Sequence, residues 1–94
     1  MTITRQIIFL AKRDCIEELK DLLKSVLPNI KNFDGCLKLD IYQTKNNLVE
    51  FIFIESWKNE ELLSLYFKSK IYLDFKEKFN QYIAHIEPFE LESL

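Results

Sequence analysis

An apolar run that begins at Val49 and ends at Trp57 limits what this chain can fold into more than any other feature. Successive residues of a β-strand point to opposite sides, so residues 51–54 place two apolar side chains on each face. Both faces of such a strand need cover. A chain of 94 residues has room for one modest core. We therefore expect helices to cover one face and a second copy of the chain to cover the other.

The composition is that of one folded domain over residues 1–94, without a visible linker. Thirteen basic and fifteen acidic residues are interspersed and leave a net charge of -2. This balance argues against a nucleic-acid partner, which usually binds a basic face. No apolar run approaches the roughly 20 residues that span a bilayer, and no basic segment with an apolar core follows the first residue. We expect no membrane partner and a cytoplasmic location.

The hydrophobic periodicity predicts the element order β-α-β-β-α-β. Strands are expected over residues 3–11, 36–44, 48–57 and 86–94, and helices over residues 14–28 and 60–83. Asp14 and Asn59 are the predicted helix caps, because their side chains can accept a hydrogen bond from the first turn. The second helical region is expected to be kinked or interrupted at Ser69-Lys70, and His85 is expected near its end.

Two of these segments carry more detailed predictions. The strand from residue 36 alternates cleanly, with Leu37, Leu39 and Ile41 predicted to face inward. Cys15 and Cys36 lack a CxxC spacing and neighbouring histidines, so we interpret them as buried thiols. A disulfide or redox pair is the alternative for the two cysteines.

Two βαβ halves with right-handed crossovers give a ferredoxin-like α+β fold. Its sheet has four antiparallel strands, with the first and third in the middle and both helices on one face. These two strands are also the two that carry apolar residues on both faces. The other sheet face then exposes a large apolar patch, which in a soluble protein usually marks an interface. We expect a homodimer that packs sheet against sheet as a dimeric α/β barrel.

A strand that ends in Glu-x-Trp, followed by an acidic-leucine helix and a later Ser, resembles the antibiotic biosynthesis monooxygenase (ABM) domain of the dimeric α/β-barrel superfamily. In this sequence those residues are Glu55, Trp57, the run 61–63 and Ser69. The Asp-Gly-Cys turn at residues 34–36 resembles the turn before the family's second strand. The element order agrees over essentially the whole chain.

The resemblance implies a small oxygenase that needs no cofactor and acts on quinols or other electron-rich aromatic compounds. An ionised phenolic substrate can supply electrons to oxygen, while the protein contributes desolvation, a donor for the oxyanion and an apolar cavity. This chain departs from the family pattern in three places. The residue nine after Trp57, a His in many relatives, is Tyr66. Quinone-forming relatives have a Tyr and an Asn where this chain has Leu63 and Phe53, so their mechanism does not transfer intact.

Six residues are the candidates for the site. The predicted catalytic residues are Trp57, Tyr66 and Glu55, and the predicted substrate-binding residues are Gln6, Arg5 and Tyr72. The cavity is expected to be lined by Trp57, Tyr66, Glu55 and Gln6. Arg5 and Gln6 are polar residues on a central strand, so one of them should line the cavity or the dimer seam. Each aromatic residue has an alternative role as a core residue.

Glu55 is the candidate base. If its side chain points into the pocket beside Trp57, burial would raise its pKa and make it a base; if it points outward, it is a surface charge. Strand parity leaves both alternatives open, because both faces of the strand are apolar. A non-catalytic dimeric module that binds a small apolar ligand is the alternative for the whole protein.

A second branch of the family degrades haem, and its Trp-Lys-Ser and Leu-Lys-Ser segments resemble residues 57–59 and 67–69 here. Its haem-ligating His falls nineteen residues after the Trp, where this chain has Lys76. Without that axial ligand we do not expect haem chemistry. The single histidine, His85, cannot build a metal site alone, so neither a metal nor a cofactor is predicted.

Overall fold

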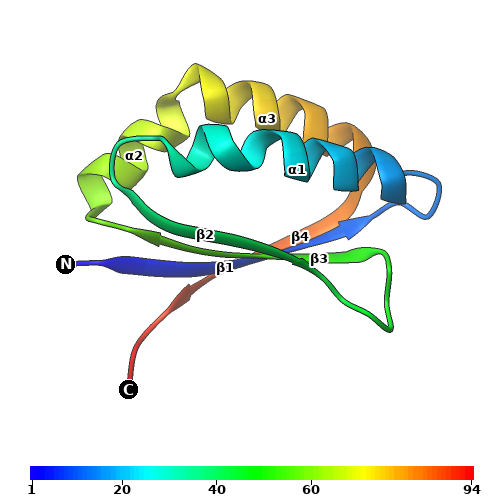
Figure 1. Cartoon of the computed structure of the whole chain (residues 1–94), viewed down its shortest axis with the longest axis horizontal. Helices are drawn as coiled ribbons and strands as arrows, with labels where there is room; N and C mark the ends of the chain where they lie inside the picture. Colours follow the sequence, from blue (N-terminus) through cyan, green and yellow to red (C-terminus); the bar gives the residue numbers. More distant parts are fainter.

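The computed structural model describes all 94 residues. Its elements are β1 (Ile3–Ala11), α1 (Ile16–Lys31), β2 (Cys36–Gln43), β3 (Glu50–Trp57), α2 (Glu60–Lys68), α3 (Lys70–Tyr82) and β4 (Ile83–Leu91). The helices form one layer over a four-stranded sheet, and the other side of the sheet is uncovered (Figure 1). This is the predicted ferredoxin-like α+β fold.

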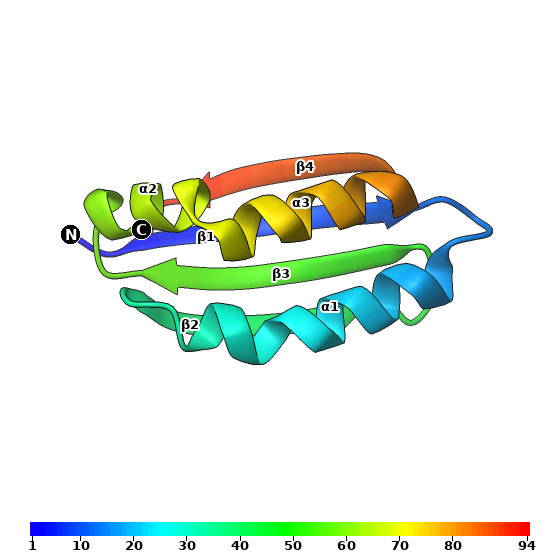
Figure 2. The ribbon, with the colours of Figure 1, turned by 90° about the horizontal axis from the view of Figure 1, so that it is seen from above.

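The strands lie in the order β2-β3-β1-β4, and every neighbouring pair is antiparallel. The prediction that the first and third strands are central is confirmed. Seen from above, α1 runs along β2 while α3 lies beside it, over the other half of the sheet (Figure 2). All three helices therefore pack on the same face.

Strict alternation along the two central strands separates the covered face from the uncovered one. The buried residues of these strands are Ile3, Ile7, Phe9 and Ala11 on β1 and Phe51, Phe53, Glu55 and Trp57 on β3. Residues between them, such as Ile8, Ile52 and Ile54, point to the uncovered face and are partly exposed. Glu55 is the one charged residue among the buried ones, so its side chain lies on the helix side of the sheet.

The interruption predicted at Ser69 is present and separates α2 from α3. The Ser69 hydroxyl donates to the Tyr66 carbonyl at 2.6 Å and accepts from the Tyr72 amide at 3.2 Å, so one side chain ends α2 and caps α3. Asn59 caps α2, as predicted, by accepting from the Leu62 amide at 2.9 Å. None of the helices is both long enough and apolar enough to cross a bilayer.

Three local predictions are wrong. Asp14 does not cap α1, since the N-cap position is Cys15 and it makes no side-chain capping bond. Leu37 is 58% exposed, because the register between β2 and β3 shifts between Cys36 and Lys38 and turns this residue outward. His85 lies in β4, which begins directly after α3, and not at a helix end.

Gly35 fixes how closely the turn before β2 approaches α2. Its φ of 93° is in the left-handed region that glycine adopts without strain. A Cβ atom at this position would lie 2.5 Å from Leu62 Cβ, so a larger residue would also clash with α2. The close approach sets the start of α2, and with it the helix that carries Tyr66, over the end of β3 that carries Glu55 and Trp57.

Candidate functional site

A small cavity of about 90 Å³ lies between the sheet and helices α2 and α3. It extends to the edge strand β4. Most of its walls are aromatic or aliphatic, and the polar groups are confined to a few side chains. The lining residues are Arg5, Ile7, Phe9, Phe53, Glu55, Tyr66, Phe67, Tyr72, Phe75, Phe79, Ile86 and Pro88.

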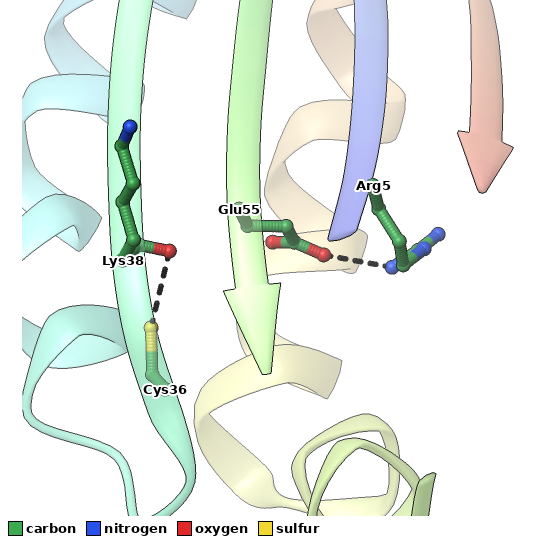
Figure 3. Close-up of polar contacts among 4 residues, drawn as sticks. All are labelled: Arg5, Cys36, Lys38 and Glu55. Atoms are coloured by element: carbon green, nitrogen blue, oxygen red, sulfur yellow. Dashed lines mark hydrogen bonds and ion pairs between the residues drawn. The ribbon is translucent and has the colours of Figure 1, made fainter. Parts of the chain in front are cut away.

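Arg5 and Glu55 form the charged part of this wall. They are directly opposite each other on β1 and β3, and Arg5 Nη1 donates to Glu55 Oε1 at 2.8 Å. Figure 3 shows this contact crossing from one central strand to the other. The Glu55 side chain is 4% exposed and the Arg5 side chain 17%. The guanidinium also lies over the Phe67 ring, 5.0 Å from its centroid, where the face of the ring attracts a cation.

Burial raises the pKa of Glu55 above its ordinary value. The positive charge of Arg5 and hydrogen bonding to the carboxylate oppose this rise. Trp57 Nε1 has no hydrogen-bond partner in the chain, but its N–H dipole also favours the ionised carboxylate. A paired carboxylate with a raised pKa, in an apolar cavity, is a group that can accept a proton from a bound ligand.

Tyr66 lies between this carboxylate and the aromatic core. Its ring stacks on Trp57 with centroids 4.7 Å apart, and Phe33 packs against it at 5.4 Å. Burial, followed by the negative charge of Glu55, strongly raises the pKa of Tyr66. Its phenol therefore stays protonated and serves as a hydrogen-bond donor and not as a base.

Tyr72 completes the polar side of the cavity from the first turn of α3. Its ring centroid is 5.2 Å from that of Tyr66 and 5.0 Å from that of Phe67. Burial raises the pKa of Tyr72 as well, against the opposing charge of Arg5. Two neutral phenols and one ion pair therefore face the cavity.

The structure brings four of the six candidate residues together and leaves two outside. Arg5, Glu55, Tyr66 and Tyr72 line the cavity. Trp57 is fully buried behind Tyr66 and does not line it, contrary to the prediction. Gln6 is paired with Ile54 and Phe89 on the uncovered sheet face, so the prediction that it lines the cavity is wrong as well.

The sequence interpretation missed the apolar half of the site. Phe67, Phe75 and Phe79 follow the three-and-four spacing of a core-facing helix stripe, and nothing in that spacing separates a cavity wall from packed core. Phe75 and Phe79 are each 3% exposed. The interrupted helix was the available signal, because the break at Ser69 lets residues before and after it converge on one space.

Two other groups lie outside the cavity. Cys36 is a free thiol that donates to the Lys38 carbonyl at 3.7 Å (Figure 3). Burial and the charge of Glu55 raise the pKa of Cys36, which keeps the thiol protonated. Lys76, at the position of the haem ligand in the haem-degrading branch, is exposed on α3 between Phe75 and Glu77. No group of three or more His, Cys, Asp or Glu side chains is placed to hold a metal ion.

Comparison with known proteins agrees with this architecture. The chain resembles PA3566 from Pseudomonas aeruginosa, with a TM-score of 0.92 and 20% identity over 99% of this chain and 94% of that one. It resembles Rv0793 from Mycobacterium tuberculosis, with a TM-score of 0.91 and 19% identity over 100% of this chain and 96% of that one. A solved antibiotic biosynthesis monooxygenase gives a TM-score of 0.90 and 15% identity over 100% of this chain and 99% of that one.

The chain has no significant match among curated proteins. The sequence model of the antibiotic biosynthesis monooxygenase family matches residues 2–78, which include β1, β2, β3, α1, α2 and most of α3. The match covers both strands that hold the Arg5–Glu55 pair and the helix that carries Tyr66. The chain therefore belongs to the antibiotic biosynthesis monooxygenase family.

Proposed function

We propose that this protein is a monooxygenase that oxidises quinols or other electron-rich aromatic compounds without a bound redox cofactor. One observation carries the proposal: an aromatic cavity has a single carboxylate in its wall, Glu55, which is 3% exposed and held by Arg5. The family supports an oxygenase or oxidoreductase role. The aromatic walls suit a flat ring, and Glu55 suits a hydroxyl on that ring.

The chemistry begins with proton transfer from the substrate hydroxyl to Glu55. The resulting phenolate is electron-rich and donates electrons to dioxygen. One oxygen atom then forms a carbonyl with a ring carbon that loses its hydrogen, and the other oxygen leaves as water. The substrate supplies all four electrons, so the reaction balances without a further reductant: a hydroquinone and dioxygen give a hydroxyquinone and water.

The chain contributes electrostatics and the exclusion of water. Arg5 stabilises the negative charge that appears when the substrate is ionised, and its own position is fixed by Glu55 and Phe67. The neutral Tyr66 and Tyr72 phenols are donors for oxygen atoms that gain charge. The phenylalanine walls keep bulk water away, which strengthens each of these interactions.

Oxygen uptake by the purified protein tests the proposal. We expect uptake above autoxidation with at least one member of a panel of benzo- and naphthohydroquinones. Tyr66→Phe and Trp57→Phe should both lower turnover, the first because it removes a donor and the second because the smaller Phe ring stacks on Tyr66 over less area. Thermal unfolding of both variants is the control. Uptake equal to that of buffer alone, with every substrate, would overturn the proposal.

A non-catalytic binding module is the second candidate. The observation that favours it is the replacement of the histidine common among relatives by Tyr66, whose raised pKa removes it as a base. Such a module would be stabilised by aromatic ligands without consuming oxygen. Ligand-dependent thermal stabilisation with no oxygen uptake would therefore select the module.

We also propose that the protein is a homodimer through the uncovered sheet face. Ile8, Ile52 and Tyr42 lie side by side on this face, and Phe89 and Leu91 continue it onto β4, each 43% exposed. A soluble protein usually covers such a patch. The closed barrel that two such sheets would form explains why both central strands carry apolar residues on both faces.

The Ile52→Lys variant is predicted to be monomeric in sedimentation equilibrium at concentrations where the wild type is a dimer. The new charge would be buried in the middle of the proposed interface without a partner. Leu65→Lys is the matched control, because Leu65 is 57% exposed on α2, away from the sheet. A monomeric wild type at micromolar concentration would contradict the dimer.

A further inference from the structure

The size of the cavity limits the size of the ligand that it can enclose. Its volume is about 90 Å³. An engineered apolar cavity that binds benzene measures about 150 Å³, and pockets for drug-sized ligands begin at about 300 Å³. The space here is therefore at most that of one aromatic ring. A compound with two fused rings cannot be enclosed without displacing part of the wall.

Phe75 and Phe79 of α3 line the cavity. Phe75 lies parallel to Phe53 of the sheet, with centroids 6.1 Å apart and an interplanar angle of 8°. Phe79 packs edge-on against Phe75 at 4.8 Å and against Phe9 at 5.3 Å. Both rings are buried between α3 and the sheet, each 3% exposed, and form one end of the cavity.

The charges of the wall limit the ligand in a second way. Arg5 and Glu55 neutralise each other at 2.8 Å, and the remaining polar groups of the cavity are two phenols. A ligand with a carboxylate would place a second negative charge near Glu55 in an apolar space. A ligand with an ammonium group would place a second positive charge near Arg5. Neither charge would find a free partner, and an unpaired buried charge is strongly unfavourable.

We propose that the cavity selects uncharged phenols with a single aromatic ring, with Phe75 as the residue that limits ring number and the Arg5–Glu55 pair as the group that rejects charged substituents. The reaction assigned to such a phenol rests on the proposed monooxygenase function. The binding preference does not, and it is measured without oxygen. The two can therefore fail separately.

Ring number is tested by anaerobic calorimetric titration with phenol and with naphthol at neutral pH. We expect wild-type protein to bind phenol at least about tenfold more tightly than naphthol, and Phe75→Ala to reverse or abolish this preference. Phe75→Leu keeps a large apolar residue and is the second variant, with a smaller shift in the same direction. Leu73→Ala is the control, since Leu73 lies on the same helix but is 53% exposed. Equal binding of both probes by the wild type would overturn the ring limit.

Charge selection is tested with two probes of nearly the same shape, para-hydroxybenzamide and para-hydroxybenzoate. The neutral amide should bind wild-type protein at least about tenfold more tightly than the anion, since burying the unpaired carboxylate has no compensation. Glu55→Gln removes the negative charge and leaves Arg5 without a counter-charge, so the affinity of the anion should rise relative to that of the amide. An unchanged ratio in this variant, with thermal unfolding like that of the wild type, would overturn the role of the ion pair.

Oxygen uptake with the same ring series separates the two proposals. Selective binding of single-ring phenols without oxygen uptake would uphold the selectivity and remove the oxygenase. Uptake that is as fast with naphthohydroquinone as with benzohydroquinone would uphold the oxygenase and remove the ring limit.

Discussion

Replacement of Glu55 by Gln is expected to lower kcat for hydroquinone oxidation by about 10²- to 10⁴-fold, the range typical of a lost general base. Gln keeps the shape and one hydrogen-bond acceptor for Arg5, but it cannot take the substrate proton. Oxygen uptake under saturating substrate measures the effect. Glu50→Gln on the same strand is the matched control, because Glu50 lies on the uncovered face and contacts Thr44. Wild-type turnover in Glu55→Gln would remove Glu55 as the base.

The assignment of Glu55 as the base also predicts how the reaction rate depends on pH. Glu55 accepts a proton only when it is ionised, so the rate should rise with pH through the raised pKa of its carboxyl. Arg5→Gln removes the charge that opposes this rise, and the acid limb should move to higher pH. Lys24→Gln, an exposed change of the same charge on α1, should leave the limb in place.

The raised pKa of Glu55 also makes the stability of the fold depend on pH. The folded protein binds the Glu55 proton more tightly than the unfolded chain, so ionising this carboxyl favours unfolding. The stabilising contribution of Glu55 to the free energy of unfolding is therefore complete below the pKa that this carboxyl has in the unfolded chain. It falls as pH rises from that value through the higher folded-state pKa. Glu55→Gln should lack this component in urea unfolding measured across the same pH window.

Trp57→Ala is the second large effect, and it concerns stability. Trp57 is 0% exposed and stacked on Tyr66, so truncation should lower the free energy of unfolding by about 3 to 5 kcal/mol. Urea unfolding measures the loss. Leu65→Ala, at an exposed position of α2, is the control and should change stability by less than about 0.5 kcal/mol. A Trp57→Ala protein as stable as this control would show that Trp57 is not the core residue that its burial indicates.

The central strands were predictable because apolar residues at consecutive positions leave a direct mark on a sequence. Residues 7–11 of β1 and 51–54 of β3 form such runs, whereas a strand with one face in water usually alternates apolar and polar residues. Asn59 was recognisable as a cap because a polar side chain precedes the start of a helical stripe, and an interruption was predicted at Ser69-Lys70. In these cases local chemistry and tertiary structure agree.

The wrong or open predictions involve information that lies elsewhere in the chain. The direction of Glu55 was undecided because residues 51–54 place apolar side chains on both faces of the strand, so parity does not say which face carries the carboxylate. Leu37 is turned outward by a register shift that depends on β3. His85 lies in β4, which begins at Ile83 directly after α3 and pairs there with Ala11 of β1. Sequence alone also could not tell packed phenylalanines from a cavity wall.

The strand order affects how the protein folds during its synthesis. β1 forms one of its two ladders with β4, the last strand of the sheet, through pairs such as Thr4 with Leu91. During synthesis β1 leaves the ribosome early and must keep one edge unpaired until β4 follows. Contacts between such distant segments slow folding relative to helical proteins of the same size. The nascent chain is thus exposed longest to edge-to-edge association at β1, the strand that contains Arg5.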